Sequence, residues 1–101
     1  MNKSDHTNES QQRGFRTLLA LFGHEIDGLS PGQIARLVGC PPSSTTRDLF
    51  NLVKAGLAEQ LPHNGNYRIS PLIGQKALAI LTALDQAERR AAETRQRFSR
   101  N

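Results

Sequence analysis

The sequence predicts a mainly α-helical fold that carries one small β-hairpin and ends in a long helix. Three observations support this fold class. Apolar residues recur at helical spacing in four segments, and proline or glycine separates these segments from one another. Two short stretches with strand character flank the turn pair Asn64-Gly65. A chain of 101 residues has room for one small domain and one appended element.

The N-terminal part of the chain predicts a tail followed by a first helix. Residues 1–12 lack apolar periodicity, so we expect them to be disordered. An apolar stripe at positions i, i+3, i+4 and i+7 then predicts a helix from Arg13 to near Gly23. The stripe consists of Phe15, Leu18, Leu19 and Phe22. In the linker that follows, Ile26 is the expected core residue.

The second helix has a complete start signal. Ser30 is suited to the N-cap, Pro31 to the first helical position, and Gln33 to the third position of a capping box. Leu29 and Ile34 have the spacing of a hydrophobic staple. Gly39 should end the helix. Its expected buried face consists of Ile34, Leu37 and Val38.

A third helix should follow Pro41-Pro42, because two successive prolines cannot continue the second one. We expect Ser43 to cap it and Gly56 to end it after Ala55. A wheel of about 100° per residue separates two faces. The face expected to pack inward holds Thr45, Leu49, Leu52 and Val53. The polar face holds Ser43, Ser44, Arg47, Asn51 and Lys54, with Phe50 at its border.

Two strands, over residues 57–61 and 67–69, should form a hairpin around Asn64-Gly65. Ser70-Pro71 then begins a long helix that continues to about Phe98. Two short helices, a hairpin and a further helix in this order predict a winged helix-turn-helix, in which the hairpin is the wing. We therefore expect a disordered tail (1–12), a winged helix-turn-helix DNA-binding domain (13–71) and a long C-terminal dimerisation helix with a basic end (72–101).

The polar face of the third helix carries side chains that recognise DNA bases. Arginine grips guanine and asparagine grips adenine, each through two hydrogen bonds. A helix N-terminus also binds phosphate through its hydroxyl and backbone N–H groups. Our candidates for reading bases are Ser43, Ser44, Arg47 and Asn51. Our candidates for contacts to the DNA backbone are Gln33, Arg36, Lys54, Asn64 and Arg68. A purely local role, in the capping box for Gln33 and in the turn for Asn64, is the alternative.

Three groups of residues within 30–72 form a recognisable pattern: Ile34-Ala35 with Gly39, then Pro41, Ser43, Ser44 and Arg47, then Gly56-Leu57 and Tyr67-Arg68-Ile69. In this pattern the segment resembles the N-terminal DNA-binding domain of IclR-type transcriptional regulators. The resemblance implies a winged helix-turn-helix that binds DNA. Asp48 stands where the family usually has leucine, and Ser44 where threonine is common. The effector domain that normally follows is absent from these 101 residues, so we expect a stand-alone DNA-binding domain and infer no small-molecule sensing.

The fourth helix has a seven-residue apolar pattern that predicts a coiled-coil seam. A long apolar face cannot be buried on so small a domain, so we expect it to pair with a second copy of the chain. The alternative is a helix that folds back on its own domain. The expected dimerisation residues are Ile73, Ala77, Ile80, Leu81, Leu84, Ala87 and Ala91. Five arginines among residues 89–100 either contact DNA or RNA, or only keep this helix end soluble.

Composition excludes several classes of function. The net charge is +4 with a pI of about 10.0, a mild excess compatible with nucleic-acid binding. A single cysteine, Cys40, excludes an intramolecular disulfide, and the polar N-terminus lacks a signal peptide. We therefore expect a soluble, cytoplasmic protein. Zinc-ligand spacing, a phosphate-binding glycine loop and a nucleophile motif are all missing, so we expect no metal, no cofactor and no enzymatic activity.

These observations together predict a sequence-specific regulator of transcription that binds double-stranded DNA as a homodimer and acts as a repressor. The alternative is a winged-helix module that binds a protein partner rather than DNA. Two features keep this alternative open. Asp48 is expected close to the groove-facing side of the third helix, and residues 13–71 have a net charge of only +2.

Overall fold

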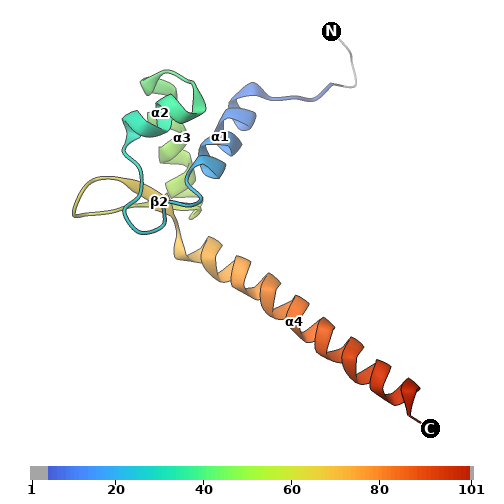
Figure 1. Cartoon of the computed structure of the whole chain (residues 1–101). Helices are drawn as coiled ribbons and strands as arrows, with labels where there is room; N and C mark the ends of the chain where they lie inside the picture. The colour runs from blue at the N-terminus through green and yellow to red at the C-terminus, as the bar shows by residue number, and fades with distance from the viewer. Residues whose placement is uncertain (1–4, 101) are drawn as a thin grey trace. The chain divides into compact units, whose positions relative to one another are not determined.

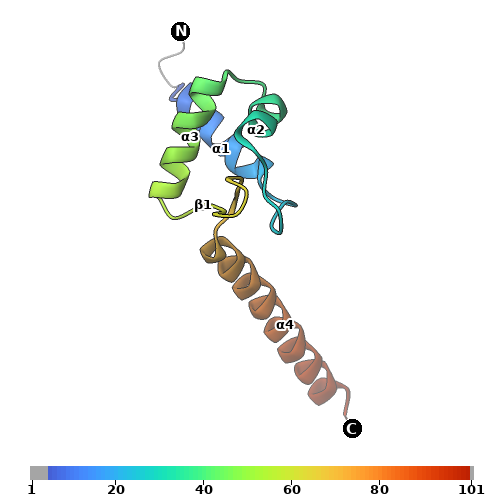
Figure 2. The same ribbon diagram turned by 90° about the vertical axis from the view of Figure 1, so that its left-hand side faces the viewer.

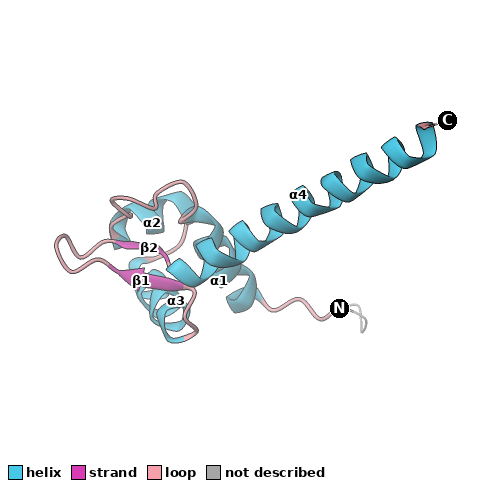
Figure 3. Ribbon diagram, turned by 90° about the horizontal axis from the view of Figure 1, so that it is seen from below, coloured by secondary structure: helices cyan, strands magenta, loops and turns pink. Residues whose placement is uncertain are grey.

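The computed structural model describes residues 5–100 and has the fold of a winged helix-turn-helix. The four helices are α1 (Glu9–Ala20), α2 (Pro31–Val38), α3 (Pro42–Lys54) and α4 (Pro71–Ser99), and the two strands are β1 (Ala58–Gln60) and β2 (Tyr67–Ile69) (Figures 1 and 3). The chain divides after Ser70 into two units, so the helix-turn-helix unit and α4 are described separately.

In the first unit α1, α2 and α3 pack pairwise against one another, and α3 also packs against β1 (Figure 2). The buried apolar residues come from α2, α3, the two strands and the segments that join the elements, including Leu21 directly after α1. They are Leu21, Leu29, Ile34, Ala35, Leu49, Leu52, Ala58, Leu61 and Ile69. The core therefore lies between the three helices and the hairpin, and only one side of α3 packs into it.

Helix α1 begins earlier than the sequence suggested. Asn8 caps it, because its side-chain oxygen accepts a hydrogen bond of 2.9 Å from the backbone N–H of Gln11. The expected disorder is therefore wrong for residues 9–12, and residues 1–4 lie outside the described part of the chain. An apolar stripe marks the packed middle of a helix, whereas a polar cap extends the helix beyond it.

The buried face of α1 also differs from the expected one. Thr17 and Leu21 are fully buried, whereas Phe15, Leu19 and Phe22 are 48–66% exposed. The helix is thus rotated by roughly one residue, about 100°, about its own axis. Thr17 is accommodated in the core because its hydroxyl donates to the carbonyl of Arg13 at 3.0 Å. The expected core role of Ile26 is also wrong, since Ile26 lies in a loop and is 80% exposed.

Helix α2 confirms its predicted ends. The Ser30 hydroxyl accepts from the Gln33 backbone N–H at 3.2 Å, and the Gln33 side chain accepts from the Ser30 N–H at 2.9 Å. Gly39 ends the helix with a left-handed φ of 77°. One expected core residue is wrong, because Leu37 is 62% exposed. Ala35, a small residue, is buried in its place beside Ile34.

Helix α3 begins one residue before the expected cap. Pro41 is its N-cap and makes no side-chain cap hydrogen bond, so the capping role assigned to Ser43 is wrong. The fixed φ of proline favours the first helical turn, where its missing N–H removes no hydrogen bond. Gly56 follows the helix with φ of 78°. Val53, expected in the core, is 41% exposed.

The wing is a short antiparallel hairpin in which Ala58 pairs with Ile69 and Gln60 with Tyr67. A second contact, absent from the sequence prediction, ties it to the segment before α2. Leu29 and Tyr67 exchange two backbone hydrogen bonds of 2.9 and 2.8 Å. Gly28 makes this contact possible, because a Cβ atom at its position would lie 2.7 Å from the carbonyl oxygen of Tyr67.

Helix α4 has 29 residues and no buried residue, and by the usual rise it is about 43 Å long. Its large apolar side chains Leu78, Ile80, Leu81 and Leu84 are 56–63% exposed. Arg89 and Asp85 form an ion pair of 3.0 Å on its surface. Among the helices of residues 5–100, none is both long and apolar enough to cross a membrane.

Candidate nucleic-acid interface

The two sides of α3 differ sharply in exposure. The side facing the core buries Thr45, Asp48, Leu49 and Leu52. Its opposite side exposes Ser43, Thr46, Arg47, Phe50, Asn51 and Lys54, and Ser44 is half-buried between the two sides. We call the exposed set the outer face of α3. Four of our candidates thus lie together on one accessible helix surface, and this surface belongs to the second helix of a helix-turn-helix.

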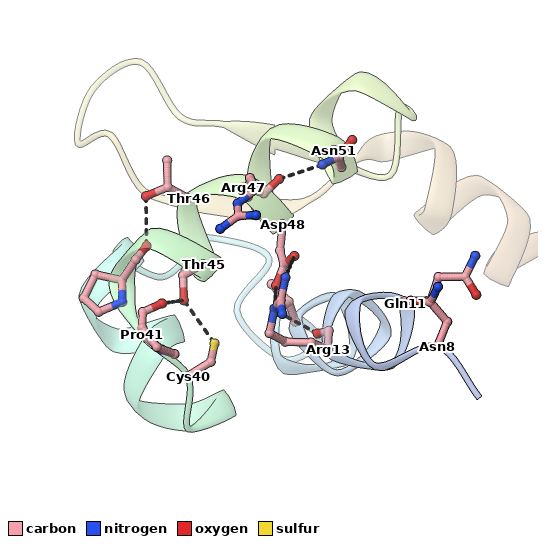
Figure 4. Close-up of polar contacts among 12 residues, drawn as sticks. Asn8, Gln11, Arg13, Cys40, Pro41, Thr45, Thr46, Arg47, Asp48 and Asn51 are labelled. Atoms are coloured by element: carbon pink, nitrogen blue, oxygen red, sulfur yellow. Dashed lines mark hydrogen bonds and ion pairs between the residues drawn. The ribbon is translucent and has the colours of Figure 1, made fainter. Parts of the chain in front are cut away.

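An ion pair joins the inner side of α3 to α1. The Nε and Nη2 atoms of Arg13 donate to the two carboxylate oxygens of Asp48 at 2.7 and 3.0 Å (Figure 4). The Asp48 side chain is only 8% exposed. These hydrogen bonds raise the pKa of the Arg13 guanidinium. Bidentate pairing of this kind is strong and directional, so it sets how α1 faces α3.

The pair corrects the expected position of Asp48, which does not lie near the groove-facing side. The burial of Asp48 could have been predicted from its spacing in the sequence. Asp48 falls four residues before Leu52 and three after Thr45, so a helix that buries those residues buries Asp48 too. A buried carboxylate needs a cation or several hydrogen bonds. Because Arg13 is 35 positions away in the chain, only the packing of α1 against α3 shows that it is the partner.

Hydrogen bonds on the outer face stay within the helix. The Asn51 amide donates to the carbonyl of Arg47 at 2.9 Å, and the Thr46 hydroxyl donates to the carbonyl of Pro42 at 3.0 Å (Figure 4). Across residues 5–100, no hydrogen bond or ion pair engages the Arg47 guanidinium or the Lys54 ammonium. Both cations are therefore available to a ligand, and Asn51 keeps its carbonyl oxygen and one N–H.

Three of the candidates for backbone contacts have local partners instead. Gln33 closes the capping box. Asn64 donates to the carbonyl of Asp27 at 3.1 Å and accepts from the N–H of Asn66 at 2.9 Å. Arg68 pairs with Glu59 at 2.8 Å and also donates to the carbonyl of Glu25 at 3.2 Å. Arg36, by contrast, is exposed on α2. The contacts of all four residues to DNA remain predictions.

Side chains that could ligate a metal ion do not gather into one site within residues 5–100. Cys40 lies half-buried with its Sγ atom 3.3 Å from the Thr45 hydroxyl. Over the described range 5–100, His, Cys, Asp and Glu side chains form no group of three able to hold a metal ion.

Comparison with known proteins adds a family to this geometry. Residues 12–62 match the model of the IclR helix-turn-helix domain. The chain belongs to this family. The family is a transcription-factor DNA-binding domain, which is not an enzyme class. No curated protein sequence matches the chain significantly.

Several solved structures resemble the chain. HmgR of Pseudomonas aeruginosa is 28% identical with a TM-score of 0.64, over 74% of this chain and 30% of that one. A MarR family regulator of Silicibacter pomeroyi is 25% identical with a TM-score of 0.54, over 80% and 55%. An IclR family regulator of Brucella abortus, at 22% identity and a TM-score of 0.60 over 81% and 32%, shares the fold. The chain thus covers about a third to about half of the length of these proteins.

Proposed function

We propose that the chain is a transcriptional regulator that binds double-stranded DNA in a sequence-specific manner, with α3 in the major groove. One observation carries this proposal: α3 presents Arg47, Asn51 and Lys54 on an accessible side opposite its buried side. Membership of the IclR helix-turn-helix family supports it. We place the protein in the cytoplasm.

The exposed side chains then have different roles. Arg47 and Asn51 read base edges, since only these two offer paired hydrogen-bonding groups on the outer face. Ser43 and Ser44, in the first turn of α3, bind a phosphate at the helix N-terminus or the adjoining base. Lys54 contributes a contact to phosphate that is independent of sequence.

The other backbone candidates contribute unequally. Arg36 is exposed and contributes in the same way as Lys54. Gln33, Asn64 and Arg68 reach phosphate only by exchanging the local hydrogen bonds described above. We therefore assign them a smaller share of the affinity.

We further propose that α4 joins two copies of the chain. Its seam of Ile73, Ala77, Ile80, Leu81, Leu84, Ala87 and Ala91 holds no buried residue within one chain. Pairing two such helices removes this apolar surface from water, which is the main driving force for association. A two-fold dimer presents two α3 helices, so its operator is an inverted repeat. Occupying such a site in a promoter excludes polymerase, and we therefore assign the protein a repressor role.

Selection of bound sequences from a random pool of duplexes tests the DNA-binding proposal. Arg47→Ala should weaken binding to the selected site by about 1–3 kcal/mol and relax preference at one position. Lys54→Ala is the matched control, since it should weaken all duplexes about equally and reduce the salt dependence by about one counterion. If no duplex binds in a salt-dependent manner, or if Arg47→Ala leaves the sequence profile unchanged, α3 is not the reader.

A second candidate function, binding of a protein partner, is favoured by one specific observation. A largely apolar groove of about 370 Å³ lies between α1 and α3. Its apolar lining includes Phe15, Leu18 and Leu57, and Arg47 and Asn51 also line it. Grooves of this kind accept apolar side chains of a partner. The earlier argument from Asp48 no longer supports this candidate, because the Asp48 carboxylate is buried against Arg13. If the chain bound duplex DNA with an affinity that changed neither with salt concentration nor with duplex sequence, this would favour the protein-partner function.

A further inference from the structure

An exposed aromatic ring lies on the outer face of α3. Phe50 is 66% exposed although it belongs to a helix that buries Leu49 and Leu52 on its other side. At about 100° per residue, Phe50 falls on one line of the helix with Ser43 and Lys54, seven residues before it and four after it. It therefore lies near the middle of the outer face rather than at the border where we expected it.

Two cationic side chains and one apolar side chain, the 41% exposed Val53, are neighbours of this ring on the helix surface. Arg47 lies three residues before Phe50 and Lys54 four residues after it, so both are its neighbours on the helix surface. Neither cation is engaged by another side chain in the described part of the structure. An apolar ring between two free cations matches the edge of a major groove, where phosphates flank the bases.

The chemistry of phenylalanine limits what it recognises there. The ring has no hydrogen-bonding group, so it distinguishes no amino or carbonyl edge of a base. The major groove presents one apolar group among its base edges, the C5 methyl of thymine. We propose that Phe50 packs against a thymine methyl group and gives each half-site a preference for thymine at one position. This inference rests on the proposed DNA-binding function and adds the class of base that the helix selects.

Deoxyuridine tests this directly, because it pairs like thymine and lacks only the methyl group. In a duplex obtained by selection, each thymine is replaced in turn by deoxyuridine, and binding is measured by fluorescence anisotropy at fixed salt. We expect one position per half-site to lose about fourfold in affinity, the value of burying one methyl-sized group. Replacing any of the remaining thymines should leave the affinity unchanged.

Variants of the protein assign the effect to Phe50. With Phe50→Ala, the thymine and deoxyuridine duplexes should bind equally. Leu19→Ala is the matched control: Leu19 is an apolar residue of α1 that is as exposed as Phe50, at 66%, and this variant should keep the fourfold difference. Circular dichroism checks that both variants fold, which the exposure of both side chains favours.

The outcomes separate the two proposals. A wild-type protein that binds its selected site with the Arg47 dependence described above, yet is indifferent to deoxyuridine everywhere, overturns the inference and leaves the function intact. A thymine preference that persists in Phe50→Ala also overturns it, since another residue then reads the methyl group. Failure to bind any duplex overturns both proposals.

Discussion

Replacing Gly28 with alanine tests how the wing is held to the segment before α2. Gly28 has φ of 69°, and an added Cβ would lie 2.7 Å from the Tyr67 carbonyl oxygen and 3.1 Å from the Asn66 Cβ. Gly39 is the matched control, because its φ of 77° is similar but nothing lies within 4 Å of its added Cβ. Both alanine variants incur the cost of a left-handed residue, and only in Gly28→Ala does the added Cβ also clash with atoms of the wing.

The structure sets the size of the difference. A left-handed alanine costs about 1 kcal/mol at either position. Relieving the 2.7 Å approach to an ordinary contact of 3.4 Å moves the Gly28–Leu29 segment away from β2 by about 0.7 Å. The hydrogen bonds between Leu29 and Tyr67, now 2.9 and 2.8 Å, then exceed the usual limit of about 3.2 Å. At about 1 kcal/mol each, their loss brings the total for Gly28→Ala to about 3 kcal/mol.

Urea unfolding at a fixed protein concentration measures both values, and the probe is already present. The chain has one tyrosine and no tryptophan, so tyrosine fluorescence reports on Tyr67 in β2. We expect Gly28→Ala to lose about 2 kcal/mol more than Gly39→Ala. Losses for the two variants within about 0.5 kcal/mol of each other would refute the reasoning, because the close approach of Gly28 to the wing would then cost nothing.

Three further predictions concern the ion pair, the dimer and the operator. Asp48→Ala should lower the free energy of unfolding by about 1–3 kcal/mol, because it leaves Arg13 without its partner. The double variant Asp48→Leu with Arg13→Leu should recover most of this loss, because an apolar pair replaces the ionic one. A double variant that loses as much as the two single changes added together, measured by urea unfolding, would contradict this. Leu84→Glu should give a monomer in sedimentation, whereas the control Gln86→Glu, on the opposite side of α4, should remain a dimer. Wild-type protein that sediments as a monomer at tens of micromolar would contradict the proposed dimer. Footprinting should show two protected patches on one face of DNA, about one helical turn apart, and a single asymmetric patch would argue against the two-fold arrangement.

Local signals made the predictions that the structure confirms most closely. The capping box at Ser30 and Gln33 and the left-handed Gly39 were predicted correctly. The reason is that a cap is a hydrogen bond between residues only a few positions apart, so a short stretch of sequence contains both partners. The same holds for the hairpin turn, where Gly65 has φ of 74°.

Burial was harder to predict wherever the partner is distant in the chain. Phe15, Leu19 and Phe22 form a regular stripe, yet the structure buries Thr17 and Leu21 on the neighbouring face of α1. Apolar periodicity shows that a helix has a preferred side but not which neighbouring helix it meets, or at what rotation. The position of Arg13 opposite Asp48 follows from that rotation.

The sequence alone determined the order of elements, the cap and end of α2, the hairpin turn and the polar character of α3, because each depends on residues within a few positions of one another. Tertiary structure decided which side chains remain available to a ligand. It engaged Arg68 with Glu59 and Asn64 with Asp27, buried Asp48 against Arg13, and left Arg47, Phe50 and Lys54 exposed. Availability depends on whether a distant group lies within hydrogen-bonding reach, and only the packing of the whole helix-turn-helix unit determines that.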